Sequence, residues 1–439
     1  MLKTYFKQAL ALFRQNRLFS TLYIAGTGLA IAMTVVMAVV YYVKLAPVYP
    51  EVNRGNTLYL TSASFHSDKE RMTTQFRLSF QAVQEWMYPL KNVEEVSAIV
   101  DYGMENSTYI QPADLSGDFN VAVKLVDPAF FRIYSFRFLE GNPFTDSDLE
   151  SGIHTAVISD DLARRLFGTT KDVVGRSFSL DYVNYRVCGV VRGASYLTSQ
   201  SYAQVYLPYS VDENYKEPST AQFPYCGKFS VTFLVRDEAQ ADALRAEIKD
   251  LTRRVNLQYK DQWQMELWKQ PTSHWLSVFQ SYPSDAGFNP WKTAGYLIVV
   301  VLVLLLVPAL NLSGLIASRM ESRLAEMGVR KSFGAGRNIL LSQVMWENFF
   351  LTLAGGLLGL VLAWIVVYLG REWIFTLLDR WSEAVPQGVD AYVSGEMLFA
   401  PAVFLIAFLL CLVLNLLSAL LPAWMSLRKP IVYSLYEKR

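Results

Sequence analysis

Four long apolar segments interrupt an otherwise polar chain, and none of them contains Asp, Glu, Lys or Arg. Each is longer than the roughly 20 residues that a helix needs to cross a bilayer. The apolar run of the first segment is too long for the core of a cleavable signal peptide, which has about 7–15 residues, so we expect this segment to stay in the membrane. The pattern predicts transmembrane helices at residues 18–43, 293–318, 348–370 and 397–424.

The charges that flank these spans predict their orientation, because short loops rich in Lys and Arg stay in the cytoplasm. Residues 1–17 have a basic and an apolar face, which predicts an amphipathic helix on the cytoplasmic membrane surface; a plain basic flank is the alternative. Segment 319–347 is cationic, whereas segment 371–396 mixes both signs and is expected to be an outer loop. The tail, 425–439, carries two basic pairs. Both termini are therefore expected in the cytoplasm.

The region 44–292 has no long apolar run and is expected to form one large domain outside the cytoplasm. Apolar runs of strand type alternate in it with segments of helical spacing. The expected strands are 56–61, 185–191 and 229–235, and the expected helices are 76–90 and 238–255. The fold class is thus an α-helical membrane protein with four transmembrane helices and a large α+β extracytoplasmic domain between helices 1 and 2.

An aromatic-rich stretch, 259–289, closes this domain. We expect part of it to form a stalk that enters the membrane, with Trp291 at the membrane interface. A surface on which a ligand stacks is the alternative.

The cationic segment after the second span is amphipathic. Its apolar positions lie on neighbouring helical faces, and a glycine-rich run is expected to end the helix. These positions are Leu324, Met327, Val329 and Phe333, followed by Gly334-Ala335-Gly336.

Within this segment, Ala325-Glu-Met-Gly-Val-Arg-Lys-Ser-Phe-Gly-Ala335 resembles the signature of MacB/FtsX-type ABC transporter permeases. In that family, a charged strip with a Gly-Ala ending follows the second transmembrane helix and docks on a separate ATPase. The resemblance implies an ATPase-coupling role for Arg323, Glu326, Gly328, Arg330, Lys331, Gly334 and Ala335. An ordinary positive-inside loop is the alternative interpretation.

A second resemblance covers the large domain. Val126–Gly141 is similar to the segment of MacB-type periplasmic domains in which a phenylalanine pair precedes Leu-x-Gly, and Ala156–Gly168 and Val187–Val191 continue it. The resemblance implies a subdomain at about 121–215 that is inserted into a second one. The glycines here are expected to serve turns or close packing, not a site. They are Gly141, Gly168, Gly175 and Gly189.

Small and polar residues inside the spans predict helix packing. Asn311 in the second span is expected to pair across helices, and Gly355-x-x-x-Gly359 in the third allows another helix to come close. We expect a homodimer or a pairing with a related permease, and this glycine face is one candidate interface.

Composition narrows the function further. The chain is 52% hydrophobic and 18% charged, which suits membrane spans joined to a folded soluble domain. A net charge of +1 gives no sign of a nucleic-acid partner, and the three histidines are too far apart in sequence for metal-ligand spacing.

Cys188 and Cys226 could pair in an oxidising compartment, but nothing in the sequence brings them together. Cys411 lies in an apolar run.

Motifs of catalysis and energy conversion are absent from these 439 residues. There is no G-x-x-x-x-G-K-[ST], G-x-S-x-G, H-E-x-x-H or C-x-x-C, and no acidic residue lies in the spans. We therefore expect no enzyme activity and no cofactor in this chain, with ATP bound by a partner ATPase.

Two functions are compatible with these observations. The first is an inner-membrane permease subunit that couples a separate ABC ATPase to conformational change of its periplasmic domain, a mechanotransmission that drives efflux or extraction of a peptide, drug or lipoprotein. The second is an FtsX-like sensor or scaffold that regulates a periplasmic partner. Membrane lipid is a partner in both, and a periplasmic adaptor or outer-membrane component is a further candidate. The sequence does not identify the substrate.

Overall fold

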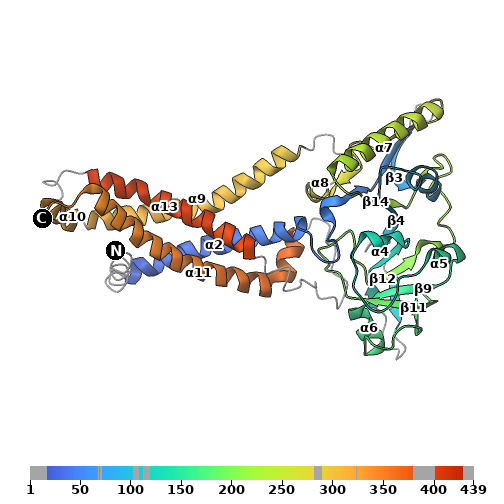
Figure 1. Ribbon diagram of the computed structural model, residues 1–439, viewed down its shortest axis with the longest axis horizontal. Helices are drawn as coiled ribbons and strands as arrows, with labels where there is room; N and C mark the ends of the chain where they lie inside the picture. The colour runs from blue at the N-terminus through green and yellow to red at the C-terminus, as the bar shows by residue number, and fades with distance from the viewer. Residues whose placement is uncertain are drawn as a thin grey trace. The chain divides into compact units, whose positions relative to one another are not determined.

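The computed structural model describes residues 17–67, 69, 72–101, 108–111, 119–280, 289–322, 324–378 and 401–428, in two compact units (Figure 1). The helical unit contains five described helices. They are α2 (Arg17–Leu45), α9 (Pro290–Ser322), α10 (Leu324–Ser332), α11 (Arg337–Leu378) and α13 (Pro401–Arg428). The predicted surface helix at 1–17 lies almost wholly outside the described residues, as does most of the tail after Arg428.

Three of the described helices are long and apolar enough to cross a membrane: Arg17–Leu45, Arg337–Gly370 and Pro401–Met425. The predicted second span, 293–318, is helical within α9. The count of four transmembrane helices stays a prediction.

The boundary of the third span differs from the expectation. Helix α11 begins at Arg337 and continues to Leu378, so residues 371–378 are helical although we predicted them to lie in the outer loop. Arg371 and Glu372 end the apolar run, but both residue types favour helix, so charge marks the end of the apolar segment without ending the helix. The rest of that loop, 379–396, lies outside the described residues.

The soluble unit, Val43–Pro290, contains a large mixed sheet. Twelve described strands form it, with β7 parallel to β12 and β9 parallel to β11. The order is β16 (Thr272–Ser273), β1 (Thr57–Leu60), β14 (Ser230–Leu234), β4 (Glu95–Asp101), β7 (Val123–Val126), β12 (Val205–Pro208), β9 (Thr155–Ser159), β11 (Val183–Val191), β10 (Ser177–Leu180), β5 (Thr108–Gln111) and β6 (Phe119–Val121), with β8 (Phe138–Gly141) paired to β11.

A smaller sheet and short helices complete this unit. The sheet has the order β13 (Cys226–Gly227), β3 (Met72–Leu78), β2 (Ala63–Ser67) and β15 (Gln264–Glu266). The helices are η1 (Arg54–Asn56), α3 (Phe80–Ala82), η2 (Val83–Met87), α4 (Ala129–Ile133), α5 (Asp146–Ser151), α6 (Asp160–Phe167), η3 (Tyr209–Val211), α7 (Glu238–Gln258) and α8 (His274–Phe279). The unit is α+β, as predicted. The bounds of an inserted subdomain stay a prediction.

The sequence patterns located a few of these elements. The three predicted strands are confirmed as β1, β11 and β14, and the predicted helix at 238–255 is α7. Asp237 caps α7 by accepting the backbone N–H of Gln240, and its apolar stripe is buried as the spacing requires. The buried positions are Ala241, Leu244, Ile248 and Val255.

The predicted helix at 76–90 is wrong at its start. Residues 76–78 belong to β3, which pairs with β2, and the helical part begins only after Ser79. The hydroxyl of Ser79 accepts the backbone N–H of Ala82, which is an ordinary helix N-cap. Strand pairing therefore overrides helical spacing before the cap.

A buried carboxylate explains why the phenylalanine-pair segment is structural. Asp127 accepts hydrogen bonds from the hydroxyls of Ser97 and Tyr88 and from two backbone N–H groups, those of Ala98 and Phe130. Burial raises the pKa of Asp127 to about 6, although these four donors act in the opposite direction. The carboxylate thus joins β4 to the start of α4, and Phe130 enters the core beside it.

Gly141 and Gly189 meet a steric requirement where β8 pairs with β11. Gly141 has φ +69°, and a Cβ there would overlap the carbonyl oxygen of Cys188. A Cβ on Gly189 would lie 2.7 Å from the carbonyl oxygen of Asn142. Both positions are structural, as the sequence analysis expects.

We therefore expect Gly141→Ala to destabilise the soluble unit by about 3 kcal/mol or more, because the new methyl group meets a left-handed backbone and a fixed carbonyl together. The measurement is the apparent Tm of the purified full chain. Gly55→Ala is the matched control, because a Cβ there meets nothing within 4 Å. Equal Tm values for the two variants would contradict this account of Gly141.

Candidate functional site

The predicted coupling segment folds as a short helix, α10, with one buried face. Met327 is buried, and so is Gly328 beside it. Met327 belongs to an apolar cluster that draws on α2, α9, α11 and α13 as well. Its other buried members are Tyr23, Ile316, Met320, Leu340, Val344, Leu351, Ala419 and Ala423. The packing holds α10 against the helices on either side of it.

Arg330 ties α10 to the start of α11. Its guanidinium donates to Oε1 of Gln343 at 2.7 Å and to Oε1 of Glu326, one turn earlier, at 2.6 Å. Gln343 in turn donates to the buried carboxylate of Glu347 at 3.3 Å. The Arg330–Glu326 pair is nearly half-exposed, so it adds little by itself. The link through Gln343 makes Arg330 an anchor within the chain.

The glycine run ends α10 as predicted. Gly334 adopts φ +91° and donates its N–H to the carbonyl of Lys331, while Ala335 donates to the carbonyl of Arg330. Ala335 packs at the edge of the apolar cluster. The left-handed turn directs the chain into α11.

The outward face of α10 is apolar. Val329 is 46% exposed and Phe333 is 88% exposed, and the two lie one helical turn apart. Beside them, burial and the charge of Arg337 lower the pKa of Lys331. Arg323 lies outside the described residues. The segment thus presents an apolar pair with charges around it, which suits contact with another protein.

The glycine face of α11 packs against α2 of the same chain. A Cβ on Gly359 would lie 2.5 Å from the carbonyl oxygen of Gly28, and one on Gly355 would lie 2.9 Å from Cβ of Thr27. The next glycine, Gly356, faces Phe408 of α13. Small residues let these backbones approach closely. This face is therefore in use within one chain, and the dimer predicted above would need another surface.

A hydrogen bond reinforces the same helix pair. The hydroxyls of Tyr23 on α2 and Thr352 on α11 lie 3.0 Å apart, and both side chains are fully buried. No sequence pattern predicted this contact; the available signal was a Tyr and a Thr within apolar runs. The side chain of Asn311 is outside the described part of α9, so its pairing stays a prediction.

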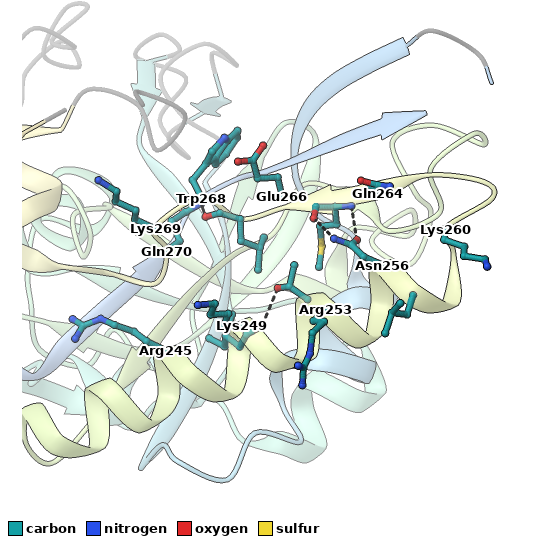
Figure 2. A pocket seen from close by; sticks show the side chains of 15 residues that line it. Arg245, Lys249, Arg253, Asn256, Lys260, Gln264, Glu266, Trp268, Lys269 and Gln270 are labelled. Atoms are coloured by element: carbon teal, nitrogen blue, oxygen red, sulfur yellow. Dashed lines mark hydrogen bonds between the residues drawn. The ribbon is translucent and has the colours of Figure 1, made fainter. Parts of the chain in front are cut away.

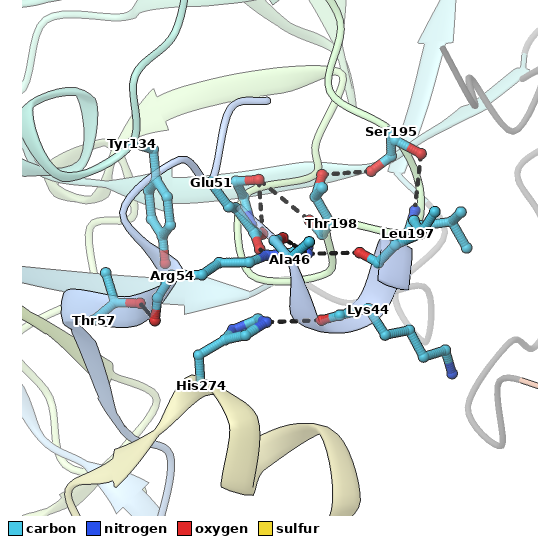
Figure 3. Close-up of polar contacts among 12 residues, drawn as sticks. Lys44, Ala46, Glu51, Arg54, Thr57, Tyr134, Ser195, Leu197, Thr198 and His274 are labelled. Atoms are coloured by element: carbon cyan, nitrogen blue, oxygen red, sulfur yellow. Dashed lines mark hydrogen bonds and ion pairs between the residues drawn. The ribbon is translucent and has the colours of Figure 1, made fainter. Parts of the chain in front are cut away.

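The C-terminal end of α2 is held by a buried arginine (Figure 3). Arg54 donates to the carbonyl oxygens of Val43 at 2.6 Å and Ala46 at 2.7 Å. These are carbonyls that a helix end leaves without partners, and a cation is favoured there by the helix dipole. Arg54 is only 3% exposed. The soluble unit thus holds the end of α2 by its backbone.

Glu51 balances the charge of Arg54. Its Oε2 accepts the Arg54 Nε–H at 2.7 Å, and its Oε1 accepts the backbone N–H and the hydroxyl of Ser201, both at 2.9 Å. Burial opposes ionisation, but the charge of Arg54 and the hydrogen bonds from Arg54 and Ser201 outweigh it, so the pKa of Glu51 lies below its ordinary value. The pair connects α2 to the loop between β11 and β12.

His274, the first residue of α8, makes a second connection. Its Nε2 lies 2.9 Å from the carbonyl oxygen of Lys44 and its Nδ1 lies 3.2 Å from the Tyr59 hydroxyl. A carbonyl only accepts, so Nε2 carries the proton and Nδ1 accepts from Tyr59. Burial and the charge of Arg54 lower the pKa of His274, which favours this neutral form. We name Glu51, Arg54, Ser201 and His274 the junction cluster.

The junction cluster was not predicted. Ser201 lies 150 residues after its partner Glu51, and His274 lies 230 residues after its partner Lys44, and no pattern marks either pairing. The pairing of Cys188 and Cys226, which the sequence left open, does not occur: both thiols are free. Among the described residues, no group of His, Cys, Asp and Glu could hold a metal ion.

Comparison with known proteins places these features in a family. The model of the MacB-like periplasmic core domain matches residues 20–251, and that of the FtsX-like permease C-terminal region matches residues 298–431. The first match alone covers more than half of the chain. The chain belongs to the MacB/FtsX-type ABC transporter permeases. The family recognised from residues 325–335 is thereby confirmed.

Relatives of this permease include MacB proteins. The macrolide export ATP-binding/permease protein MacB of Escherichia coli K12 is 27% identical over 303 residues, which is 67% of this chain and 40% of MacB. The MacB protein of Bdellovibrio bacteriovorus is 25% identical over 302 residues, 67% of this chain and 42% of that protein. The permease therefore matches only about two fifths of the length of these relatives, which carry an ATP-binding part as well.

Two solved structures each match about half of this chain. The periplasmic region of MacB from Actinobacillus actinomycetemcomitans gives a TM-score of 0.32 at 14% identity, covering 48% of this chain and 88% of that one. The extracellular domain of the ABC-type transporter YknZ from Gram-positive bacteria gives 0.33 at 15% identity, covering 48% and 100%. At TM-scores this low, the family assignment rests on the sequence matches.

Gly359→Ala should loosen the α2–α11 crossing, because its methyl group would meet the Gly28 carbonyl; overpacking of this kind costs about 1–3 kcal/mol. We expect a lower apparent Tm of the full chain in detergent. Gly314→Ala on α9 is the control, since a Cβ there meets nothing within 4 Å. A Gly359→Ala protein as stable as the control would show that α2 and α11 do not cross here.

Proposed function

We propose that this permease is the membrane subunit of an ABC transporter and that it couples ATP hydrolysis on a separate ATPase subunit to movement of its large domain. The work performed is efflux or extraction of an envelope substrate such as a peptide, drug or lipoprotein. Its place is the inner membrane, with both termini in the cytoplasm and Val43–Pro290 in the periplasm. It acts as a homodimer or with a related permease.

The exposed apolar pair on α10 carries this proposal. Val329 and Phe333 lie in the one segment between spans that is both cationic and of family type. A phenylalanine that is 88% exposed on a short helix is costly to leave in water and suits a groove on a partner. The partner that the family provides at this position is the ABC ATPase.

Contacts inside the chain support the transmission of motion from that surface. Met327 and Arg330 hold α10 to α11, so a displacement of α10 moves α11 with it. Gly355 and Gly359 hold α11 to α2. The junction cluster then holds the end of α2, so that α2 acts as the element that carries displacement into the soluble unit.

The contacts of α10 also indicate which of its residues should be replaced to test docking of the ATPase. Reversal of Arg330 would break its bond to Gln343 and so disturb the fold, which makes the apolar pair the sharper target. We expect Val329→Ser/Phe333→Ser to lose the co-purifying ATPase while the protein keeps its Tm and membrane insertion. The measurement is pull-down of the tagged full chain from mild detergent extract, with mass spectrometry of what it retains.

Ile153→Ser/Leu139→Ser, at exposed positions of the soluble unit, is the matched control and should keep the ATPase. Retention of the ATPase by the α10 variant would refute docking at this surface. A wild-type chain that brings down no ATPase would overturn the proposed function itself. An ATPase that binds, with export intact in a deletion strain and only a periplasmic partner's activity lost, would favour the FtsX-like sensor role.

The junction cluster predicts a variant in which ATP hydrolysis is no longer coupled to export. Replacing a buried ion pair by apolar residues of similar size is often neutral for stability, whereas removing one partner costs about 3–5 kcal/mol. Arg54→Met/Glu51→Leu removes both charges together but leaves the Val43 and Ala46 carbonyls without this donor, so we expect it to fold with a lower Tm than the wild type. It should keep its ATPase and ATP hydrolysis, yet lose at least about tenfold in export because the end of α2 is no longer held. Arg54→Met alone should be unstable. Normal export by the folded double variant would show that motion does not pass through Arg54.

A further inference from the structure

An open groove of about 810 Å³ lies on the soluble unit between α7 and the segment from Gln264 to Gln270 (Figure 2). Its volume is in the range of ligand sites in proteins, which span roughly 300–1,000 Å³. Nothing in the proposed transport mechanism uses it. The groove therefore needs an explanation of its own.

The groove is strongly cationic. Its lining contains five cations, Arg245, Lys249, Arg253, Lys260 and Lys269, against one carboxylate, Glu266. Within α7, Arg245 and Arg253 form ion pairs with neighbouring aspartates. Lys249, Lys260 and Lys269 are not in an ion pair anywhere in the described part of the chain. The surplus charge on these lysines favours an anionic occupant.

The strand edge in the groove is already satisfied. Asn256 on α7 donates from Nδ2 to the carbonyl of Met265 and accepts the Met265 N–H at Oδ1, at 2.8 and 2.7 Å. The carbonyl of Leu267 accepts from Gln270. A peptide therefore cannot add to β15 as another strand, and recognition must use side chains.

Trp268 stands on the groove wall in an unusual backbone conformation. Its φ is +53°, a region that bulky residues rarely adopt, and its side chain is only partly buried. Such strain is often found at functional sites. By contrast, Trp263, from the same aromatic-rich stretch, is buried and stacks on Tyr259. Figure 2 shows the Trp268 ring beside Glu266, on the side of this segment that points away from α7, so it offers contact only at the rim of the groove.

From these observations we propose that the groove binds an acidic peptide segment of about six or seven extended residues. The cations run along α7 from Arg245 and continue to Lys260 just past its end, a path of about 20 Å at the rise of an α-helix, which matches that length of extended chain. Carboxylates contact the lysines, an apolar side chain rests on the exposed Leu257, and Trp268 adds contact at the rim. An acyl chain fits less well, because Ile248, Met265 and Leu267 in the lining are already buried. The proposal does not depend on the proposed transport function.

The test uses the full chain in nanodiscs of phosphatidylcholine and a rhodamine-labelled hexapeptide of four glutamates, a leucine and a phenylalanine. The same peptide with glutamines in place of glutamates is the ligand control. Fluorescence anisotropy gives Kd at low salt and at about 0.5 M salt. We expect the glutamate peptide to bind at least about tenfold more tightly than the glutamine peptide and to lose this advantage at high salt.

Two variants and a matched control locate the site. Lys249→Glu/Lys269→Glu should weaken binding about tenfold, whereas Lys171→Glu/Lys216→Glu, with the same charge change on exposed lysines outside the groove, should weaken it less than about twofold. Trp268→Gly suits the positive φ, so it should keep the fold and also weaken binding. Equal effects of the two lysine pairs, or no preference for the glutamate peptide, would overturn the proposal. Binding of dodecyl phosphate without binding of the peptide would overturn it in favour of an anionic amphiphile.

Discussion

The buried guanidinium of Arg54 is the interaction on which the permease depends most. A helix that ends in a folded domain leaves its last carbonyls without partners, and in a buried setting each of them is costly. Arg54 satisfies two of these carbonyls, and Glu51 keeps its charge compensated. Desolvation makes such a pair a poor source of stability. What the pair provides is a specific set of hydrogen bonds to the backbone of Val43 and Ala46.

The helical unit complements this arrangement by close packing instead of charge. The glycines of α11 bring its backbone against α2 on one side and Phe408 on the other, and the buried Tyr23–Thr352 contact adds a polar restraint. Contacts of this kind do not slide, because a shift along either helix places side chains where only a glycine fits. A short helix docked on α11 can therefore move other helices without a change in their internal structure. Rigid packing of this kind is what the proposed coupling of ATP hydrolysis to movement of the large domain requires.

The soluble unit contains residues that stabilise the fold and, separately, surface residues that we propose bind a ligand. Asp127 and the glycines of β8 and β11 serve the fold alone. The groove along α7 differs, because its lysines and Trp268 contribute little to the core. Such a division allows the same framework to serve family members with different partners, since the surface of α7 can change without disturbing the sheet.

The sequence by itself determined the apolar spans, the α+β character of the large domain, the family and the end of α10 at the Gly334 turn. These are local properties: hydropathy, periodicity and turn chemistry each act within about 20 residues. Tertiary structure alone decided that the glycine face of α11 meets α2, that Arg330 is an anchor, that residues 76–78 form a strand and that Arg54 and His274 hold the end of α2. Each of these joins residues far apart along the chain, or depends on which face of an element is covered. Packing between distant residues determines such contacts, and no local pattern in a single sequence predicts it.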